Sequence, residues 1–214
     1  MSAPVVLYGL TRSVYTRIAR LALEEKGVPY TLEEVEIFGP QGVPADHLRR
    51  HPFGRIPVLA HGNFSLYETA AIGRYVDEAF SGPALQPPSA SARARMAQIV
   101  GVLDAYAYRP MVWGVFVQRV RFALQGKAAD EALIAASMQA ARSVLAALDS
   151  LMGDSPFLAG AAVSLADLHA YPMLGYLVLA PEGSTAIEAH PRIARWMASL
   201  ANRPSVQRTR SPYE

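Results

Sequence analysis

Residues 53–72 read FGRIPVLAHGNFSLYETAAI, and this stretch decides the fold. Two short β-prone runs, 57–60 and 64–67, are separated by His-Gly-Asn at 61–63, which predicts an antiparallel hairpin. Apolar residues then recur at helical spacing over 69–79, which predicts a helix. The stretch is therefore a ββα unit that begins at a proline.

A second unit precedes it in the chain. Residues 5–8 read as a short buried strand, and the apolar face over 18–23 predicts a helix that stops at Gly27. Imperfect alternation over 30–37 predicts a further strand, followed by a Gly- and Pro-rich loop at 39–43. Strand, helix and strand at this spacing predict a parallel pair with a crossover connection.

The rest of the chain is helical in pattern. Residues 90–122 predict a long helix that Pro110 should kink or break. Further helices are predicted over 130–152, 165–179 and 191–201. We therefore expect a first domain at 1–81, a linker at 82–89 and an all-helical domain at 90–214.

Composition removes several function classes. The 214 residues include no cysteine, so disulfides, thiolate metal sites and cysteine nucleophiles are excluded. The formal net charge is +2, and no run of five like charges suggests a nucleic-acid partner. No signal-peptide pattern and no apolar run of membrane-spanning length occur, so we expect a cytoplasmic protein without a membrane partner.

Three segments carry a resemblance to a known family. FGRIPVL at 53–59 resembles the part of the thioredoxin fold that holds a cis-proline before its third strand. LYETAAI at 66–72 is similar to the glutathione transferase signature Glu-Ser/Thr-x-x-Ile, and SLAD at 164–167 resembles that family's capping motif. In this order the segments resemble a serine-type (phi/theta-like) bacterial member of the cytosolic glutathione transferase superfamily. The resemblance implies an α/β thioredoxin-like N-terminal domain and an all-α C-terminal domain.

The resemblance implies a glutathione site in the first domain. A cis Ile56-Pro57 bond would let the Ile56 backbone pair with the cysteinyl part of glutathione like an added strand; a trans proline at an edge strand is the alternative. Glu68 would bind the γ-glutamyl ammonium, and Thr69 a carboxylate at the helix N-terminus. An ordinary helix cap is the alternative for this pair. Arg55 stands where relatives have a polar residue that reaches glutathione.

Ser13 is the residue expected to act on the thiol. It lies between the first strand and the first helix, where serine-type members place the activating hydroxyl. A hydroxyl that donates to the sulfur, together with the positive end of the helix, stabilises thiolate over thiol. Helix capping alone is the alternative for Ser13. The competing candidates for contact with the sulfur are Tyr8, Thr11, Arg12 and Thr16.

The contact with the glycyl carboxylate is left open. The family's basic residues in the loop after the second strand are missing, and Gly42 and Val43 stand in their place. His51 could replace them, although we favour a solvated loop histidine. Ser164 and Asp167 are interpreted as a capping box, a folding element.

Aromatic residues gather around Pro110 in the helical half. The resemblance implies that they overlook the sulfur and form an apolar electrophile pocket, although core packing must account for some of them. The residues concerned are Tyr106, Tyr108, Arg109, Trp113 and Phe116, of which we assign Tyr106, Arg109 and Trp113 to the pocket.

Two functions are compatible with these features. The first is a homodimeric glutathione transferase that adds the thiolate of its co-substrate glutathione to an apolar electrophilic small molecule, without a metal. The alternative is a non-catalytic module of the same fold that serves binding or protein interaction. Disulfide reduction is disfavoured because it normally needs a protein cysteine.

Overall fold

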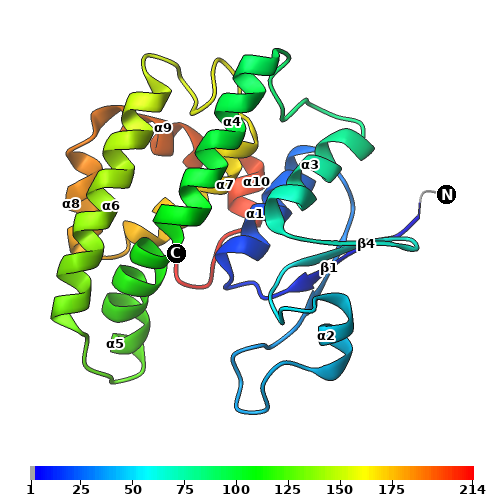
Figure 1. Cartoon of the computed structure of the whole chain (residues 1–214), viewed down its shortest axis with the longest axis horizontal. Helices are drawn as coiled ribbons and strands as arrows, with labels where there is room; N and C mark the ends of the chain where they lie inside the picture. The colour runs from blue at the N-terminus through cyan, green and yellow to red at the C-terminus, as the bar shows by residue number, and fades with distance from the viewer. Residues whose placement is uncertain (1–2) are drawn as a thin grey trace. The chain divides into compact units, whose positions relative to one another are not determined.

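The hairpin predicted from residues 57–67 forms one side of a four-stranded mixed sheet (Figure 1). The strands lie in the order β2-β1-β3-β4. β1 and β2 are parallel, whereas β3 pairs antiparallel with both β1 and β4. The predicted parallel pair and the predicted hairpin are both confirmed. The strands are β1 (Val5–Gly9), β2 (Thr31–Glu34), β3 (Val58–His61) and β4 (Phe64–Tyr67).

Helices cover both faces of this sheet. α1 (Val14–Glu25) and α3 (Thr69–Ala79) pack side by side on one face, and α2 (Ala45–Arg50) lies on the other (Figure 1). α1 stops as predicted, because Gly27 adopts a φ of +66° that suits glycine. The sequence did not predict α2, since six residues are too few to show a helical repeat.

The structure describes residues 3–214, and the chain divides into two compact units. The first is Met1–Leu85 together with Pro204–Glu214, and the second is Gln86–Arg203. The helical domain expected from the sequence includes the last eleven residues, whereas in the structure these residues group with the sheet.

Ion pairs explain why the C-terminal segment belongs to the first unit. Its helix α10 (Pro204–Arg208), which the sequence did not predict, packs against α1. Arg208 pairs with Glu24 at 2.5 Å, and the buried Arg17 pairs with Glu214. These charges belong to residues almost 200 positions apart, so no local pattern reveals the contact.

The second unit is built from helices around a buried central one. All residues of α7 except Tyr171 are buried, which is typical of a helix surrounded on every side. α8 escaped prediction because it is short and buries only Gly183, Ala186 and Ile187. The helices are α4 (Ala90–Val102), η1 (Leu103–Ala107), η2 (Arg109–Arg121), α5 (Phe122–Leu124), α6 (Glu131–Met152), α7 (Leu165–Leu177), α8 (Pro181–Glu188) and α9 (Pro191–Ala201).

Pro110 does not break the long helix that contains it. The chain continues from α4 through two π-helical segments, η1 and η2, and Pro110 lies in the first turn of η2. The Tyr108 N–H donates to the Leu103 carbonyl, five residues back. Of the two predicted outcomes, a kink or a break, the break is therefore wrong, because wider turns take up the loss of the proline N–H.

Asp167 anchors the start of α7. The Ser164 N–H donates to its carboxylate at 2.8 Å, as predicted for a capping box. The same carboxylate accepts from the Leu158 N–H at 2.8 Å and from the Trp196 indole at 2.7 Å. Burial raises the pKa of Asp167, while these hydrogen bonds act against the rise. The residue is structural, as the sequence indicates.

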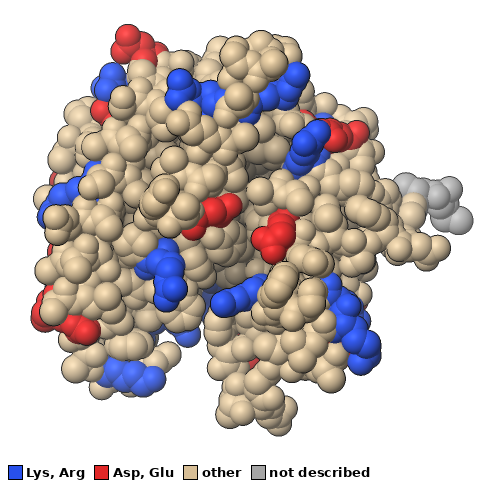
Figure 2. All heavy atoms as spheres, viewed as in Figure 1, with Lys and Arg blue, Asp and Glu red and all other residues tan. Residues whose placement is uncertain are grey.

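Charges of both signs are mixed on the face that Figure 2 shows. On the face shown in Figure 2, basic and acidic side chains are scattered among large uncharged areas, and neither sign forms a continuous field. Within residues 3–214, no helix has both the length and the apolar character needed to cross a membrane.

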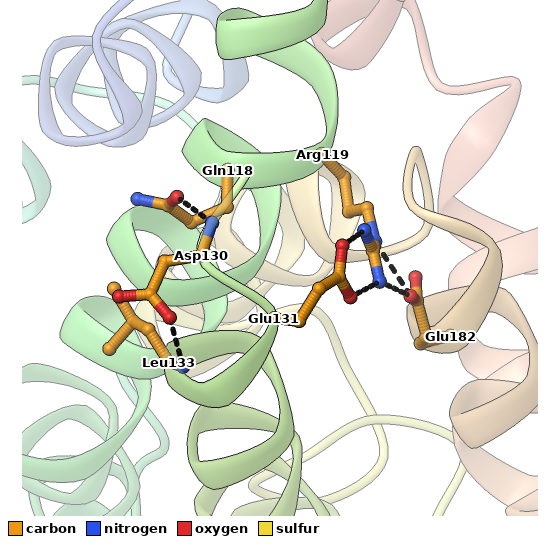
Figure 3. A network of polar contacts seen from close by, with 6 residues as sticks. All are labelled: Gln118, Arg119, Asp130, Glu131, Leu133 and Glu182. Carbon is orange, nitrogen blue, oxygen red and sulfur yellow. Dashed lines mark hydrogen bonds and ion pairs between the residues drawn. The ribbon is translucent and has the colours of Figure 1, made fainter. Parts of the chain in front are cut away.

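A polar network joins three helices of the second unit (Figure 3). Arg119, near the end of η2, donates to both carboxylate oxygens of Glu131 at 2.5 and 2.7 Å. It also donates to Glu182 of α8 at 2.7 Å. Beside it, the Gln118 side chain accepts from the Asp130 N–H, and Asp130 caps α6. The network therefore fixes where α6 begins.

We predict that Arg119→Gln lowers the melting temperature at neutral pH. We also predict that the melting temperature of this variant falls less steeply than that of the wild type as the pH is lowered. Arg119 holds the pKa of Glu131 and of Glu182 below their ordinary 4.5. A carboxyl group whose pKa is lower in the folded than in the unfolded protein stabilises the fold at pH values above its unfolded pKa. This stabilisation is lost as the pH falls through the folded pKa. Thermal unfolding between about pH 7 and pH 3 measures both effects.

Arg121→Gln is the matched control, since it removes the same charge from the same helix. If it changes the acid dependence as much as Arg119→Gln does, net charge and not the network is responsible.

Candidate functional site

The register of the sheet brings three chain segments to one edge. Tyr8 pairs opposite Val58, and Val58 pairs opposite Tyr67. The chain therefore leaves β1, enters β3 and leaves β4 at the same end of the sheet. The turn after β1, the proline before β3 and the start of α3 meet there.

The bond between Ile56 and Pro57 is cis, as predicted. Both residues are buried and stand immediately before β3. Two residues earlier, Gly54 has a φ of +60° and its N–H donates to the His51 carbonyl at 2.9 Å. The segment leading to the cis bond is therefore held by His51, the C-cap residue that follows α2. Arg55 is exposed.

The junction between β4 and α3 has an uncommon backbone. Glu68 has a φ of 71°, and within residues 3–214 no other non-glycine residue has a positive φ. Such a conformation costs about 1–3 kcal/mol, and residues of this kind cluster at ligand sites. Glu68 occupies the N-cap position and is exposed, whereas Thr69 is the first residue of the helix and is buried. The interpretation of Thr69 as a possible cap is therefore wrong.

Ser13 is the N-cap of α1. Its side-chain oxygen accepts a hydrogen bond from the Thr16 N–H at 3.3 Å. Because a hydroxyl that accepts keeps its own proton, Ser13 can still donate to a further acceptor. The side chain is partly exposed and lies at the positive end of a twelve-residue helix. Capping and donation are thus compatible in one residue.

The competing hydroxyls are engaged elsewhere. Thr11 donates to the Glu34 carboxylate through both its hydroxyl and its N–H, the latter at 2.9 Å. Thr16 is completely buried, and its hydroxyl oxygen accepts from the Leu10 N–H. A Cβ at Gly9 would lie 2.4 Å from that oxygen, so only glycine allows α1 to approach β1 this closely.

Arg12 and Tyr8 also have partners. Arg12 forms an ion pair with Glu36. The guanidinium carbon of Arg50 lies 4.4 Å from the centre of the Tyr8 ring, a cation–π contact on the sheet face that α2 covers. Of the hydroxyls proposed to contact the sulfur, that of Thr11 donates to Glu34 and that of Thr16 is completely buried, whereas Ser13 is partly exposed and keeps its proton while it accepts from the Thr16 N–H.

A cleft of about 670 Å³ opens beside this turn. Tyr8, Arg50 and residues 33–36 and 39–46 contribute to its lining. Residues 39–46 include no lysine, arginine or histidine, as the sequence shows. Two of the lining acids, Glu34 and Glu36, hold Thr11 and Arg12 in place. The sequence does not reveal these roles, because glutamates at and after the end of an exposed strand are indistinguishable from solvated ones.

His51 is not a solvated loop residue, contrary to expectation. It is the C-cap of α2 and only 3% exposed. Its ring lies 4.6 Å from the ring of Tyr67 and 6.1 Å from that of Phe53, measured between centres. Burial lowers the pKa of His51 below its ordinary 6.5. His51 is buried because it caps α2, a helix that the sequence did not predict.

Comparison with known proteins identifies the family. Residues 7–84 match the N-terminal domain of glutathione S-transferases, and residues 131–199 match their C-terminal domain. Glutathione S-transferase F14 of Arabidopsis thaliana is 30% identical, over 89% of this chain and 77% of the relative. The structure of glutathione S-transferase III in apo form is 30% identical with a TM-score of 0.85, over 97% of this chain and 95% of that one.

The chain belongs to the glutathione S-transferase family. A further structure, glutathione S-transferase I bound with lactoylglutathione, is 27% identical with a TM-score of 0.84, over 97% of this chain and 98% of that one. The predicted fold, a thioredoxin-like domain followed by a helical one, is confirmed.

The residues around Pro110 in the helical unit divide into two groups. Tyr106 is 65% exposed and Trp113 is 37% exposed, and Arg109 is exposed as well. Phe116 is buried and stacks on Tyr176 with ring centres 4.1 Å apart, so it belongs to the core. The pocket role of the first three stays a prediction. Within residues 3–214, no group of three or more potential ligand side chains could hold a metal ion.

We predict that Glu34→Ala loosens the turn before Ser13. The substitution removes the acceptor of both Thr11 hydrogen bonds, so the Thr11 and Ser13 N–H groups should exchange with solvent about tenfold faster. Hydrogen exchange followed by mass spectrometry measures this. Glu33→Ala is the matched control, an exposed neighbour with the same charge. Equal exchange in the two variants would show that Glu34 does not hold the turn.

Proposed function

We propose that this protein is a glutathione transferase that adds the glutathione thiolate to an apolar electrophilic small molecule. The observation that carries the proposal is the state of the turn at 11–13, where the Thr11 hydroxyl is engaged by Glu34 and Ser13 keeps a proton to donate. The similarity to a glutathione S-transferase that was solved with lactoylglutathione supports the proposal that this chain binds glutathione.

The first domain binds glutathione through backbone and charge. The backbone of Ile56, beside the cis bond to Pro57, pairs with the cysteinyl part. Glu68 binds the γ-glutamyl ammonium, and the first N–H groups of α3 with the Thr69 hydroxyl bind the adjacent carboxylate. Arg55 is exposed and adds a cation for a carboxylate.

Ser13 activates the thiol without covalent chemistry on the protein. Its hydroxyl donates to the sulfur and the N-terminus of α1 adds a positive potential, so the thiolate is favoured over the thiol. Lowering the thiol pKa by two units needs about 2.7 kcal/mol of differential stabilisation. A charge-assisted hydrogen bond of about 1.5–3 kcal/mol is of that order.

The remaining parts of the proposal rest on the resemblance. Tyr106, Arg109 and Trp113 form the electrophile pocket, and their exposure is compatible with contact to a small apolar molecule. The protein acts as a homodimer in the cytoplasm.

One feature favours the alternative, a non-catalytic module of the same fold. Residues 39–46 lack the basic side chains that would hold the glycyl carboxylate. Glutathione binding without turnover of an aryl halide would favour the module over the enzyme.

We predict that Glu68→Gln and Thr69→Ala each weaken glutathione binding by about tenfold or more, because each removes a charge-assisted contact worth about 1.5–3 kcal/mol. Calorimetric titration with glutathione measures the dissociation constants, and thermal unfolding measures stability. Glu78→Gln, at the other end of α3, is the control for loss of charge. An unchanged dissociation constant with a lowered melting temperature would make the pair structural.

We further predict that Ser13→Ala raises the apparent pKa of bound glutathione and slows conjugation near neutral pH. Affinity for glutathione should change little, because the other contacts remain. At a pH that ionises the thiol unaided, the variant should recover much of the lost rate. The measurement is the pH–rate profile with an aryl-halide electrophile.

Thr11→Val is the matched control, since it removes a neighbouring hydroxyl that already donates to Glu34 and keeps the backbone N–H that holds the turn to the same carboxylate. Its apparent thiol pKa should equal that of the wild type. If the Ser13→Ala and wild-type profiles superimpose, another donor acts on the sulfur.

A further inference from the structure

His47 is a polar side chain in the core of the first unit, and the proposed function makes no use of it. It lies on α2 and is completely buried. Its Nε2 lies 2.7 Å from the carbonyl oxygen of Arg55. A carbonyl can only accept, so Nε2 carries the proton and His47 is the donor. The bond therefore fixes both the tautomer of the ring and the position of the carbonyl.

The carbonyl in question belongs to the peptide that leads into Ile56. In the proposed complex, the backbone of Ile56 pairs with glutathione, so the orientation of the preceding peptide decides where that backbone points. A shift of one peptide plane would misdirect the Ile56 N–H. His47 thus acts on the ligand-binding backbone through a single intervening group.

α2 holds the same segment at a second point. The Gly54 N–H donates to the His51 carbonyl at 2.9 Å, and a Cβ at Gly54 would lie 3.1 Å from the Val43 side chain. The N–H of Gly54, whose φ is +60°, is therefore held by the His51 carbonyl, and the carbonyl of Arg55 is held by the His47 imidazole. An apolar side chain at position 47 could fill the same space, but it could not orient a carbonyl.

We propose that His47 is a positioning residue for glutathione: its imidazole N–H holds the Arg55 peptide so that the Ile56 backbone is presented to the ligand. The inference rests on the proposed function and assigns part of glutathione affinity to α2, a helix without a proposed ligand contact. His47 touches neither the sulfur nor the electrophile, so its effect falls on binding and not on the chemical step.

The test compares His47→Leu, which has no donor, with His47→Gln, whose amide N–H can replace Nε2–H. Calorimetric titration should give a glutathione dissociation constant about tenfold higher for His47→Leu and within about twofold of wild type for His47→Gln. With an aryl halide, His47→Leu should raise the KM for glutathione by a similar factor, while kcat at saturating glutathione stays within about twofold.

A second readout needs no ligand. In the ligand-free protein, the Gly54 N–H, which donates to the His51 carbonyl in the same segment, should exchange with solvent faster in His47→Leu than in wild type or His47→Gln. Val76→Ala, which removes buried methyl groups from α3, controls for a general loss of stability and should leave the dissociation constant unchanged. If His47→Leu does not fold, His47→Met takes its place.

Equal glutathione affinity in His47→Leu and wild type would overturn the inference. The inference would also be overturned if His47→Gln bound glutathione as weakly as His47→Leu. The packing of the imidazole ring, and not its hydrogen bond to the Arg55 carbonyl, would then account for the effect. In both cases wild-type binding would leave the proposed function standing. Failure of the wild type to bind glutathione would overturn the proposed function and this inference together.

Discussion

The antiparallel pairing of β3 with β1 and β4 is the constraint on which the candidate site depends. It places Tyr8, Val58 and Tyr67 in one row across the sheet. The chain turns away from this row in three places, and each turn exposes backbone groups that the sheet no longer pairs. A site built there binds largely through backbone and helix ends, and therefore needs few side chains of a particular type.

Most of the fold could be predicted, because its signals are local. The hairpin over 57–67 follows from two β-prone runs and a turn, and the caps at Ser13 and Ser164 follow from residue type and spacing. The cis bond at Ile56-Pro57 was accessible through the resemblance. These features depend on residues within a few positions of one another.

What escaped prediction depends on contacts between distant residues. Glu34 meets Thr11 across 23 positions, and Arg17 meets Glu214 across 197. In the sequence, His51 resembles a solvated loop residue, because α2 is too short to show the helical repeat of apolar residues. A charged or imidazole side chain takes its role from its partner, and a single sequence does not show which partner the fold supplies.

The connection between β2 and β3 supports both ligand-facing turns of the first domain. At its beginning, Glu34 and Glu36 hold the turn that carries Ser13. At its end, α2 holds the Gly54 and Arg55 peptides that lead to the cis bond. Residues 39–46 of this connection include no basic side chain, and what the connection supplies to the neighbouring turns is the carboxylates of Glu34 and Glu36 and the buried donor His47. Apart from the proposed contacts of Arg55 and Ile56, its contribution to the proposed glutathione site is therefore the shape of the two turns. Substitutions of Glu34, Glu36 or His47 should act on that site without touching the ligand.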